Sequence, residues 1–254
     1  MIEKTCSSIV TKIFGLGEVR MTLRLFSLPA VPAVLSITAG YIDTAGFLAL
    51  HGLFTSHVTG NFVTIGASLA YGTSGAIAKI LALPVFCVVV FATRILRFRL
   101  ERSGLPVLGV WLALQFVLLT IAAALALNYG PFPDANTVPA IATGLTLVVA
   151  MAIQNAFHRI HLSSFPPSTI MTGTTTQAML DLADLVYGVP ADAKPGLTAR
   201  LSALLDSILA FAIGCAISAV IYTHFGEWVF AVAPLLGGIT IALYFWEKRL
   251  EPAA

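Results

Sequence analysis

The sequence predicts an all-α integral membrane protein, with six spanning helices plus two short or interrupted helices arranged as two inverted structural repeats. The first observation is composition: 58% of the 254 residues are hydrophobic and 10% are charged, whereas soluble domains carry roughly 25% charged residues. The second is a series of apolar runs of about twenty residues, the length that crosses a ~30 Å hydrocarbon core. The third is that polar residues and turn formers interrupt two of these runs.

Residues 1–27 are expected to form a cytoplasmic amphipathic tail ahead of a single membrane domain, 28–254. Basic residues alternate with apolar ones in this tail, at Lys4, Lys12, Arg20 and Arg24. The tail contains no long apolar stretch that ends in a small-residue cleavage site, so it does not have the pattern of a signal peptide.

Eight apolar segments follow, four in each of the halves 28–127 and 138–246. In chain order they are 28–50, 56–71, 77–96, 105–127, 138–160, 168–187, 199–222 and 228–246. Six are long enough to cross the membrane. The second is short and rich in Gly, Ser and Thr, and the sixth contains two aspartates and follows a Pro-Pro pair. We therefore expect these two segments to dip into the membrane and return on the same side.

The placement of Lys and Arg distinguishes this arrangement from eight full crossings. With eight crossings, nine basic residues lie on one side and five on the other. With two dips, thirteen of the fourteen lie on the side of the N-terminus, and Lys79 alone lies on the other. Because cytoplasmic loops carry an excess of Lys and Arg, the dipping arrangement is favoured, with both termini in the cytoplasm.

Two dips make each half a succession of span, dip, span and span, so the second half has the opposite orientation. The linker 128–137 contains Gly130, Pro131 and Pro133 and no Lys or Arg, as an outside loop would. Inverted repeats with interrupted helices are typical of secondary transporters, which bind solutes at the breaks near the midplane. Irregular backbone at that depth must be satisfied by protein, water or ligand.

The first interrupted stretch places one carboxylate, Asp43, inside an apolar run that breaks at His51 and Gly52. A charge there costs roughly 2.5–3.5 kcal/mol, which suggests either a functional site or a structural anchor for a neighbouring dip. A histidine near this acid could relay protons or be merely solvated. The candidate binding residues of this stretch are Tyr41, Asp43, Ser56, His57, Thr59, Gly60 and Asn61.

A weaker pattern of the same kind occurs in the second half, where a break at Pro166 and Pro167 separates an amide pair from another Thr-Gly pair. Gly allows close backbone approach and Thr can cap a helix, so each Thr-Gly pair is expected to open a short helix. Its positive end would suit an anion, a carbonyl or a file of water; tight packing of small residues is the alternative. The candidate residues are Gln154, Asn155, Thr172, Gly173 and Thr174, with Asp206 as a second acid.

Several classes of function lack support in the sequence. Cys6, Cys87 and Cys215 are far apart and fit no metal spacing, so we expect no metal and no cofactor. No basic stripe with interleaved aromatic residues suggests a nucleic-acid partner. The G-x-S-x-G, P-loop and G-x-G-x-x-G motifs are absent, and no nucleophile–base pair stands out, so an enzyme is not expected.

Taken together, the motifs resemble those of the YoaK-like family of multi-pass bacterial membrane proteins, domain of unknown function 1275. The resemblance covers roughly residues 30 to 245 and implies a multi-pass protein of the bacterial inner membrane, without implying an activity. One departure is Ala152-Ile153 before the amide pair, where the family has Gly. The matching residues are Gly40-Tyr41, Asp43, Gly46-Phe47-Leu48, the run from Ser56 to Asn61, Gln154-Asn155-Ala156 and Thr172-Gly173-Thr174.

Two hypotheses follow for function. The first is a small-solute or ion transporter, or a channel, whose midplane site lies at Asp43 and the two Thr-Gly breaks. The second is a non-transporting membrane scaffold or assembly protein, in which the same polar residues hold helices together. A water-filled cavity that reaches Asp43 favours the first, and a dry, fully packed Asp43 favours the second. The expected partners are the lipid bilayer and an unidentified small solute or ion, and a homo-oligomer is left open.

Overall fold

The computed structural model describes residues 28–250, and all the regular elements of this part are helices, which confirms the predicted all-α class. The predicted tail 1–27 lies outside the described residues. Two short 3-10 helices accompany the α-helices, η1 (Val58–Gly60) and η2 (Gly226–Ala231). The α-helices are α2 (Ala30–Ala49), α3 (Asn61–Tyr71), α4 (Ala76–Arg102), α5 (Val107–Tyr129), α6 (Val138–His161), α7 (Met171–Tyr187), α8 (Lys194–Phe225) and α9 (Val232–Leu250).

Five stretches of the described chain are long and apolar enough to cross a membrane. Four of them are the single helices α2, α4, α5 and α6, and the fifth, Lys194–Leu250, contains α8, η2 and α9. Large apolar side chains also face outward: Val88 and Phe91 of α4 are 67% and 70% exposed, and Leu235 of α9 is 63% exposed. An apolar exterior of this extent is what contact with lipid requires.

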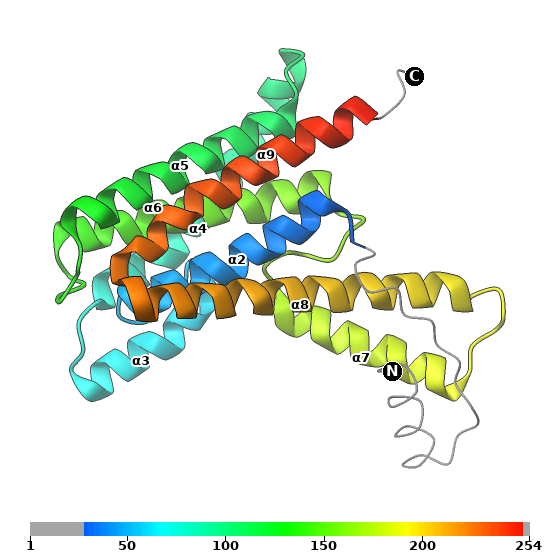
Figure 1. Cartoon of the computed structure of the whole chain (residues 1–254), viewed down its shortest axis with the longest axis horizontal. Coiled ribbons are helices and arrows are strands. Elements are labelled where there is room, and N and C mark those ends of the chain that lie inside the picture. The colour runs from blue at the N-terminus through cyan, green and yellow to red at the C-terminus, as the bar shows by residue number, and fades with distance from the viewer. Residues whose placement is uncertain (1–27, 251–254) are drawn as a thin grey trace.

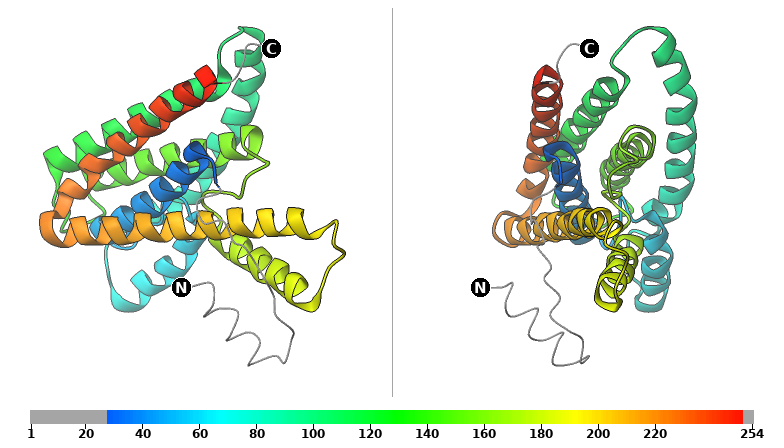
Figure 2. Two further views of the ribbon diagram at one scale, coloured as in Figure 1. Left: turned by 45° about the vertical axis from the view of Figure 1, so that its right-hand side comes forward. Right: turned by 90° about the vertical axis from the view of Figure 1, so that its right-hand side faces the viewer.

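The long helices form a bundle in which α2 and α6 occupy the interior (Figure 1). α2 packs mainly on α8, and α6 packs on α4 and α5, while α9 lies against both α5 and α2. Figure 2 shows α4 at the opposite edge of the bundle from α9. Fully buried side chains from α2, α6, η2 and the segment after α2 make up the main core, among them Ile42, Leu53, Met151 and Phe230.

The contact between α2 and α8 is unusually close. A Cβ atom on Gly40 would lie 2.1 Å from the carbonyl oxygen of Phe211, and one on Gly214 would lie 2.1 Å from that of Ile37. The two glycines therefore let the backbones of the two helices touch, as small residues do between membrane helices.

The predicted breaks occur where the sequence places them. α2 ends at Ala49, and the next residues include His51 and Gly52 with φ of 53° and 88°. α6 ends at His161, and a segment without regular structure, 162–170, precedes α7. The two following helices begin later than the predicted 56 and 168, because the first residues of each predicted segment turn back toward α2 or α6. α8 begins earlier than predicted, at Lys194, with a proline in its first turn, where proline is well tolerated.

The short helices α3 and α7 lie along the same edge of the bundle and extend toward opposite ends (Figure 1). They contain 11 and 17 residues, so at 1.5 Å per residue they extend roughly 17 and 26 Å, less than the thickness of a ~30 Å core. α3 packs on α4, and α7 packs on α8. A bidentate ion pair joins α7 to α8, with Arg200 Nε and Nη2 each 2.7 Å from an oxygen of the buried Asp181.

Candidate functional site

The first break is built around the carboxylate of Asp43, which is 3% exposed in the second half of α2. Its Oδ1 accepts hydrogen bonds from the amide of Thr55 at 2.8 Å, the hydroxyl of Thr55 at 2.9 Å and the amide of Ser56 at 2.7 Å. Its Oδ2 accepts one from the hydroxyl of Ser56 at 2.7 Å and one from Nδ1 of His57. These five bonds occupy the lone pairs of both oxygens.

This arrangement explains why the chain turns back after α2. The segment that follows cannot satisfy its own amides by helical bonds, and unsatisfied buried amides are costly. Bonds from an amide to a carboxylate are short and strong, so Asp43 can hold two consecutive residues in irregular conformation. Asp43 is therefore the anchor of the break, and its five hydrogen bonds to protein donors leave neither oxygen available to a solute.

His57 is the most exposed member of this cluster, since its side chain is 34% exposed while that of Asp43 is 4% exposed. Its ring lies edge-on to Phe211 of α8, with centroids 5.4 Å apart. Because Nδ1 donates to the carboxylate, Nε2 of the neutral ring is an acceptor and becomes a donor when the ring is protonated. The pair can thus hold a proton, or offer a hydrogen bond, at Nε2.

Asn61, the first residue of α3, closes the other side of the break. Its Oδ1 accepts from the amide of Phe54 at 2.9 Å, and its Nδ2 donates to the carbonyl of the same residue at 2.8 Å. Asn61 is 1% exposed. One buried amide side chain therefore satisfies both backbone groups of Phe54, which makes it a positioning residue.

The second break has the same design with neutral side chains. Gln154 of α6, which is fully buried, donates from Nε2 to the hydroxyl of Ser168 at 3.0 Å and to the carbonyl of Leu35 at 2.9 Å. The hydroxyl of Thr169 donates to Oδ1 of Asn155 at 2.5 Å. A polar pair on α6 thus holds the segment after it, as Asp43 of α2 holds the first break. The bond to Leu35 also ties this cluster to α2.

The structure separates two of the predicted residues from the breaks. The hydroxyl of Tyr41 donates to the carbonyl of Val229 at 2.6 Å, so Tyr41 fixes α2 to η2. Asp206 accepts from the amide of Leu28 at 3.2 Å, just before α2 begins. Since Asp43 lies toward the far end of α2, the two carboxylates are roughly 20 Å apart. Asp206 and Asp43 therefore do not form one site.

The Thr-Gly pairs do not cap the short helices as predicted. The residues that precede α3 and α7 are Gly60 and Ile170, and neither helix has a side-chain cap hydrogen bond. Thr59, Thr172 and Gly173 are exposed. The buried Thr174 donates to the carbonyl of Ile170 at 2.6 Å, within its own helix. The hydroxyl groups that hold the breaks instead come from residues before these pairs, and the side-chain amide of Asn61 follows the first pair.

The candidates predicted from the sequence lacked four residues of these clusters, namely Thr55, Gln115, Ser168 and Thr169. Thr55 contributes two of the five donors to Asp43, and its position beside Ser56 was the available signal. Gln115 of α5 donates from Nε2 to Oε1 of Gln154 at 2.6 Å. As the only Gln in a long apolar run, it could have been paired with the buried Gln of α6.

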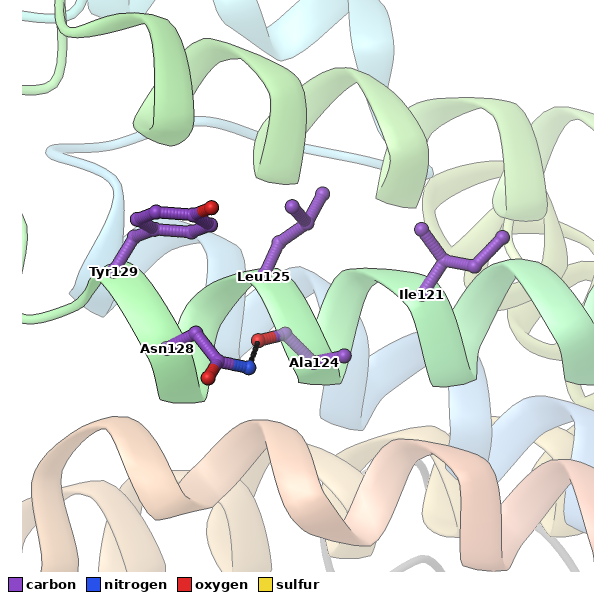
Figure 3. Close-up of a pocket in the computed structure, with 5 residues that line it drawn as sticks. All are labelled: Ile121, Ala124, Leu125, Asn128 and Tyr129. Carbon is purple, nitrogen blue, oxygen red and sulfur yellow. Dashed lines mark hydrogen bonds between the residues drawn. The ribbon is translucent and has the colours of Figure 1, made fainter.

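Outside the breaks, in the part of the chain that the structure describes, neither a surface groove nor a cluster of metal ligands offers a candidate site. Figure 3 shows an open groove on α5, where Asn128 donates to the carbonyl of Ala124 at 2.7 Å and is thereby satisfied. The remaining residues that line it are Ile121, Leu125 and Tyr129, so its surface is mainly that of a lipid-facing helix. Within residues 28–250, no three His, Cys, Asp or Glu side chains gather as a metal site would require.

Comparison with known proteins identifies one family. Residues 31–243 match the profile of the family described as "Protein of unknown function (DUF1275)". The match contains both breaks and every long helix, apart from the ends of the first and the last. No curated protein and no solved structure matches the chain.

Proposed function

Since the chain belongs to the DUF1275 family and its helices are apolar, it is a membrane protein, and we propose that it transports or conducts a small solute or ion across the bacterial inner membrane. In this proposal six helices cross and α3 and α7 dip. The site lies at the breaks, and His57 contacts the solute or the proton. Asp43 acts through His57 rather than by direct contact.

The packing of the helices supports two inverted repeats, α2 to α5 and α6 to α9. The contact of α2 with α8 corresponds to that of α6 with α4, and the contact of α3 with α4 corresponds to that of α7 with α8. Likewise α5 packs on α6 as α9 packs on α2. In Figure 1, α2 and α6 run in opposite directions, as equivalent helices of inverted repeats must.

The observation that carries the proposal is a chemical difference between the two breaks. The neutral pair Gln154 and Asn155 holds the second break, so an ionisable pair is unnecessary for anchoring alone. The first break nevertheless uses Asp43 with His57. An ionisable pair inside a membrane is less favourable than an amide pair. Transport coupled to a proton or an ion would account for its presence.

The scaffold hypothesis has one specific observation in its favour. Both oxygens of Asp43 are occupied by protein donors, and the residue is 3% exposed, as in a purely structural anchor. A scaffold has no need of a partly exposed imidazole beside the anchor, so substitution of His57 distinguishes the two hypotheses.

Topology is tested by labelling single cysteines from each side of the membrane. After replacement of the native cysteines, a cysteine at Ser103 is expected to react only from the cytoplasm, because it follows the arginines of α4. A cysteine at Asn136, between α5 and α6, is expected to react only from outside. Labelling of position 103 from outside would contradict the six-crossing arrangement.

The solute is sought by thermal shift on the purified protein, because a ligand that binds only the folded state raises its melting temperature. Pools of ions, carboxylates, amino acids and neutral solutes are compared on the wild type, on His57→Gln and on His224→Gln. His224 lies exposed at the end of α8, so its variant is the matched control. We expect a solute that stabilises the wild type and the control but not His57→Gln. A shift of equal size in all three proteins would remove His57 from the site.

A further inference from the structure

Lys79 is a buried cation whose hydrogen-bond partner is a neutral hydroxyl group. It lies in the first turn of α4, is 3% exposed, and donates from Nζ to the hydroxyl of Ser68 of α3 at 2.7 Å. None of the ion pairs among residues 28–250, defined by a 4.0 Å limit, includes Lys79. An ammonium has three N–H donors, and a buried charge without a counter-ion is costly.

The second half of the chain contains the corresponding arrangement with its counter-ion. Ser68 follows Asn61 at the same separation as Asp181 follows Thr174, and a Thr-Gly pair directly precedes Asn61 and Thr174 alike. Ser68 faces a cation of α4, just as Asp181 faces Arg200 of α8. This correspondence rests on the two-repeat arrangement proposed above.

The dipoles of α4 and α3 have opposite effects on the charge of Lys79 and partly cancel. The N-terminus of α4 is the positive end of its dipole, so a cation in its first turn is unfavourable there. The last turn of α3 is negative, but the carbonyl of Ser68 already accepts bonds from the amides of Gly72 and Thr73. A further anionic group near Nζ would therefore be stabilised.

We infer that Lys79 and Ser68 bind an oxyanion, a carboxylate or a phosphate, in the position that the carboxylate of Asp181 holds beside Arg200. Nζ supplies the charge, and the Ser68 hydroxyl can donate a hydrogen bond once it is oriented. The oxyanion comes either from a free solute or from the phosphate of a lipid headgroup at the end of α4. If it is the free solute, the transported class is anionic.

The experiment is a melting-temperature measurement on the purified full-length protein in detergent. Sodium acetate and sodium phosphate are compared with sodium chloride at equal ionic strength. A separate arm compares nanodiscs of phosphatidylcholine with nanodiscs containing phosphatidylglycerol. The variants are Lys79→Met, which removes the charge, and Ser68→Asp, which supplies the carboxylate of the second half. Lys248→Met is the control, because Lys248 is an exposed lysine in the last turn of α9.

We expect acetate or phosphate to raise the melting temperature of the wild type and of Lys248→Met by several degrees, with the shift lost in Lys79→Met and Ser68→Asp. Without the anion, both of these variants should melt higher than the wild type, because the buried charge is removed or paired. A shift with phosphatidylglycerol alone, equally dependent on Lys79, would assign the oxyanion to lipid.

Anion-dependent shifts of equal size in the wild type and Lys79→Met, or no shift in any arm, would overturn the inference. Because the readout is binding rather than flux, such a result would leave the transport proposal to its own test at His57. Conversely, if the anion raises the melting temperature but no flux is found, the anion site is supported and the transport proposal is not.

Discussion

Asp43→Leu is expected to lower the free energy of unfolding by roughly 3–5 kcal/mol, the cost of removing one partner from a buried charged pair. The substitution leaves the amides of Thr55 and Ser56, both hydroxyls of these residues and Nδ1 of His57 without an acceptor. The first break then has no anchor. Reversible unfolding in mixed detergent, followed by circular dichroism, measures the loss.

Asp43→Asn is the matched variant, because it keeps the shape and one carbonyl acceptor while it removes the charge. We expect a smaller loss of about 1–2 kcal/mol, with helical content retained. If Asp43 only anchors the break, the folded Asn variant should still bind the solute. If the negative charge of Asp43 orients the His57 ring or favours its protonation, binding of the solute should fall. Equal stability of the Leu and Asn variants would contradict the anchoring role derived from the five hydrogen bonds.

Gly214→Ala is expected to destabilise the bundle by about 3 kcal/mol, the upper part of the range for overpacking. Its new methyl group would lie 2.1 Å from the carbonyl oxygen of Ile37, and a backbone atom cannot move aside as a side chain can. Gly40→Ala meets the carbonyl of Phe211 at the same distance, so it should have a similar effect. Both would force α2 and α8 apart, which the same unfolding experiment would detect.

Gly66→Ala provides the control for these substitutions. Gly66 lies within α3, and a methyl group there would meet no atom within 4 Å. Alanine inside a helix is more stable than glycine by roughly 0.5–1 kcal/mol, so this variant should be neutral or slightly stabilised. Gly214→Ala as stable as Gly66→Ala would show that the helices can separate without cost.

The sequence predicted the helical class and both breaks, because composition and turn formers act locally. Apolar runs of about twenty residues are sufficient to predict membrane helices. The two breaks are marked by residues with restricted or unusual backbone conformation, which are His51 and Gly52 in the first and the Pro166-Pro167 pair in the second. The acid in the middle of an apolar run and Ser56, which hydrogen-bonds to it, were both among the candidates.

The composition of the site was harder to predict, because sequence spacing gives depth along a helix but not which neighbour a side chain meets. Tyr41 and Asp43 are two positions apart and so about 200° apart around α2. One therefore reaches η2 and the other the first break. Asp206 was grouped with Asp43 by charge alone, although α8 places it at the opposite end of α2. The link between Gln115 and Gln154 depends on the packing of α5 against α6.

The register that we propose between the two halves was likewise hard to find from the sequence. Ser68 and Asp181 share no chemistry, so in the sequence only their equal spacing from a Thr-Gly pair relates them. We propose their equivalence because each faces a cation on the next helix. The Thr-Gly pairs were valuable as markers of that register, even though they do not cap the helices that they introduce.

Flux in proteoliposomes tests the central claim most directly. Vesicles that contain trapped pyranine report proton movement when a membrane potential and the solute found by thermal shift are applied. The wild type and His224→Gln should show solute-dependent flux above that of protein-free vesicles, and His57→Gln, folded to the same extent, should lose at least 90% of it (about 1.4 kcal/mol or more in the barrier). Flux through His57→Gln equal to that of the wild type would contradict the account of the first break as the site.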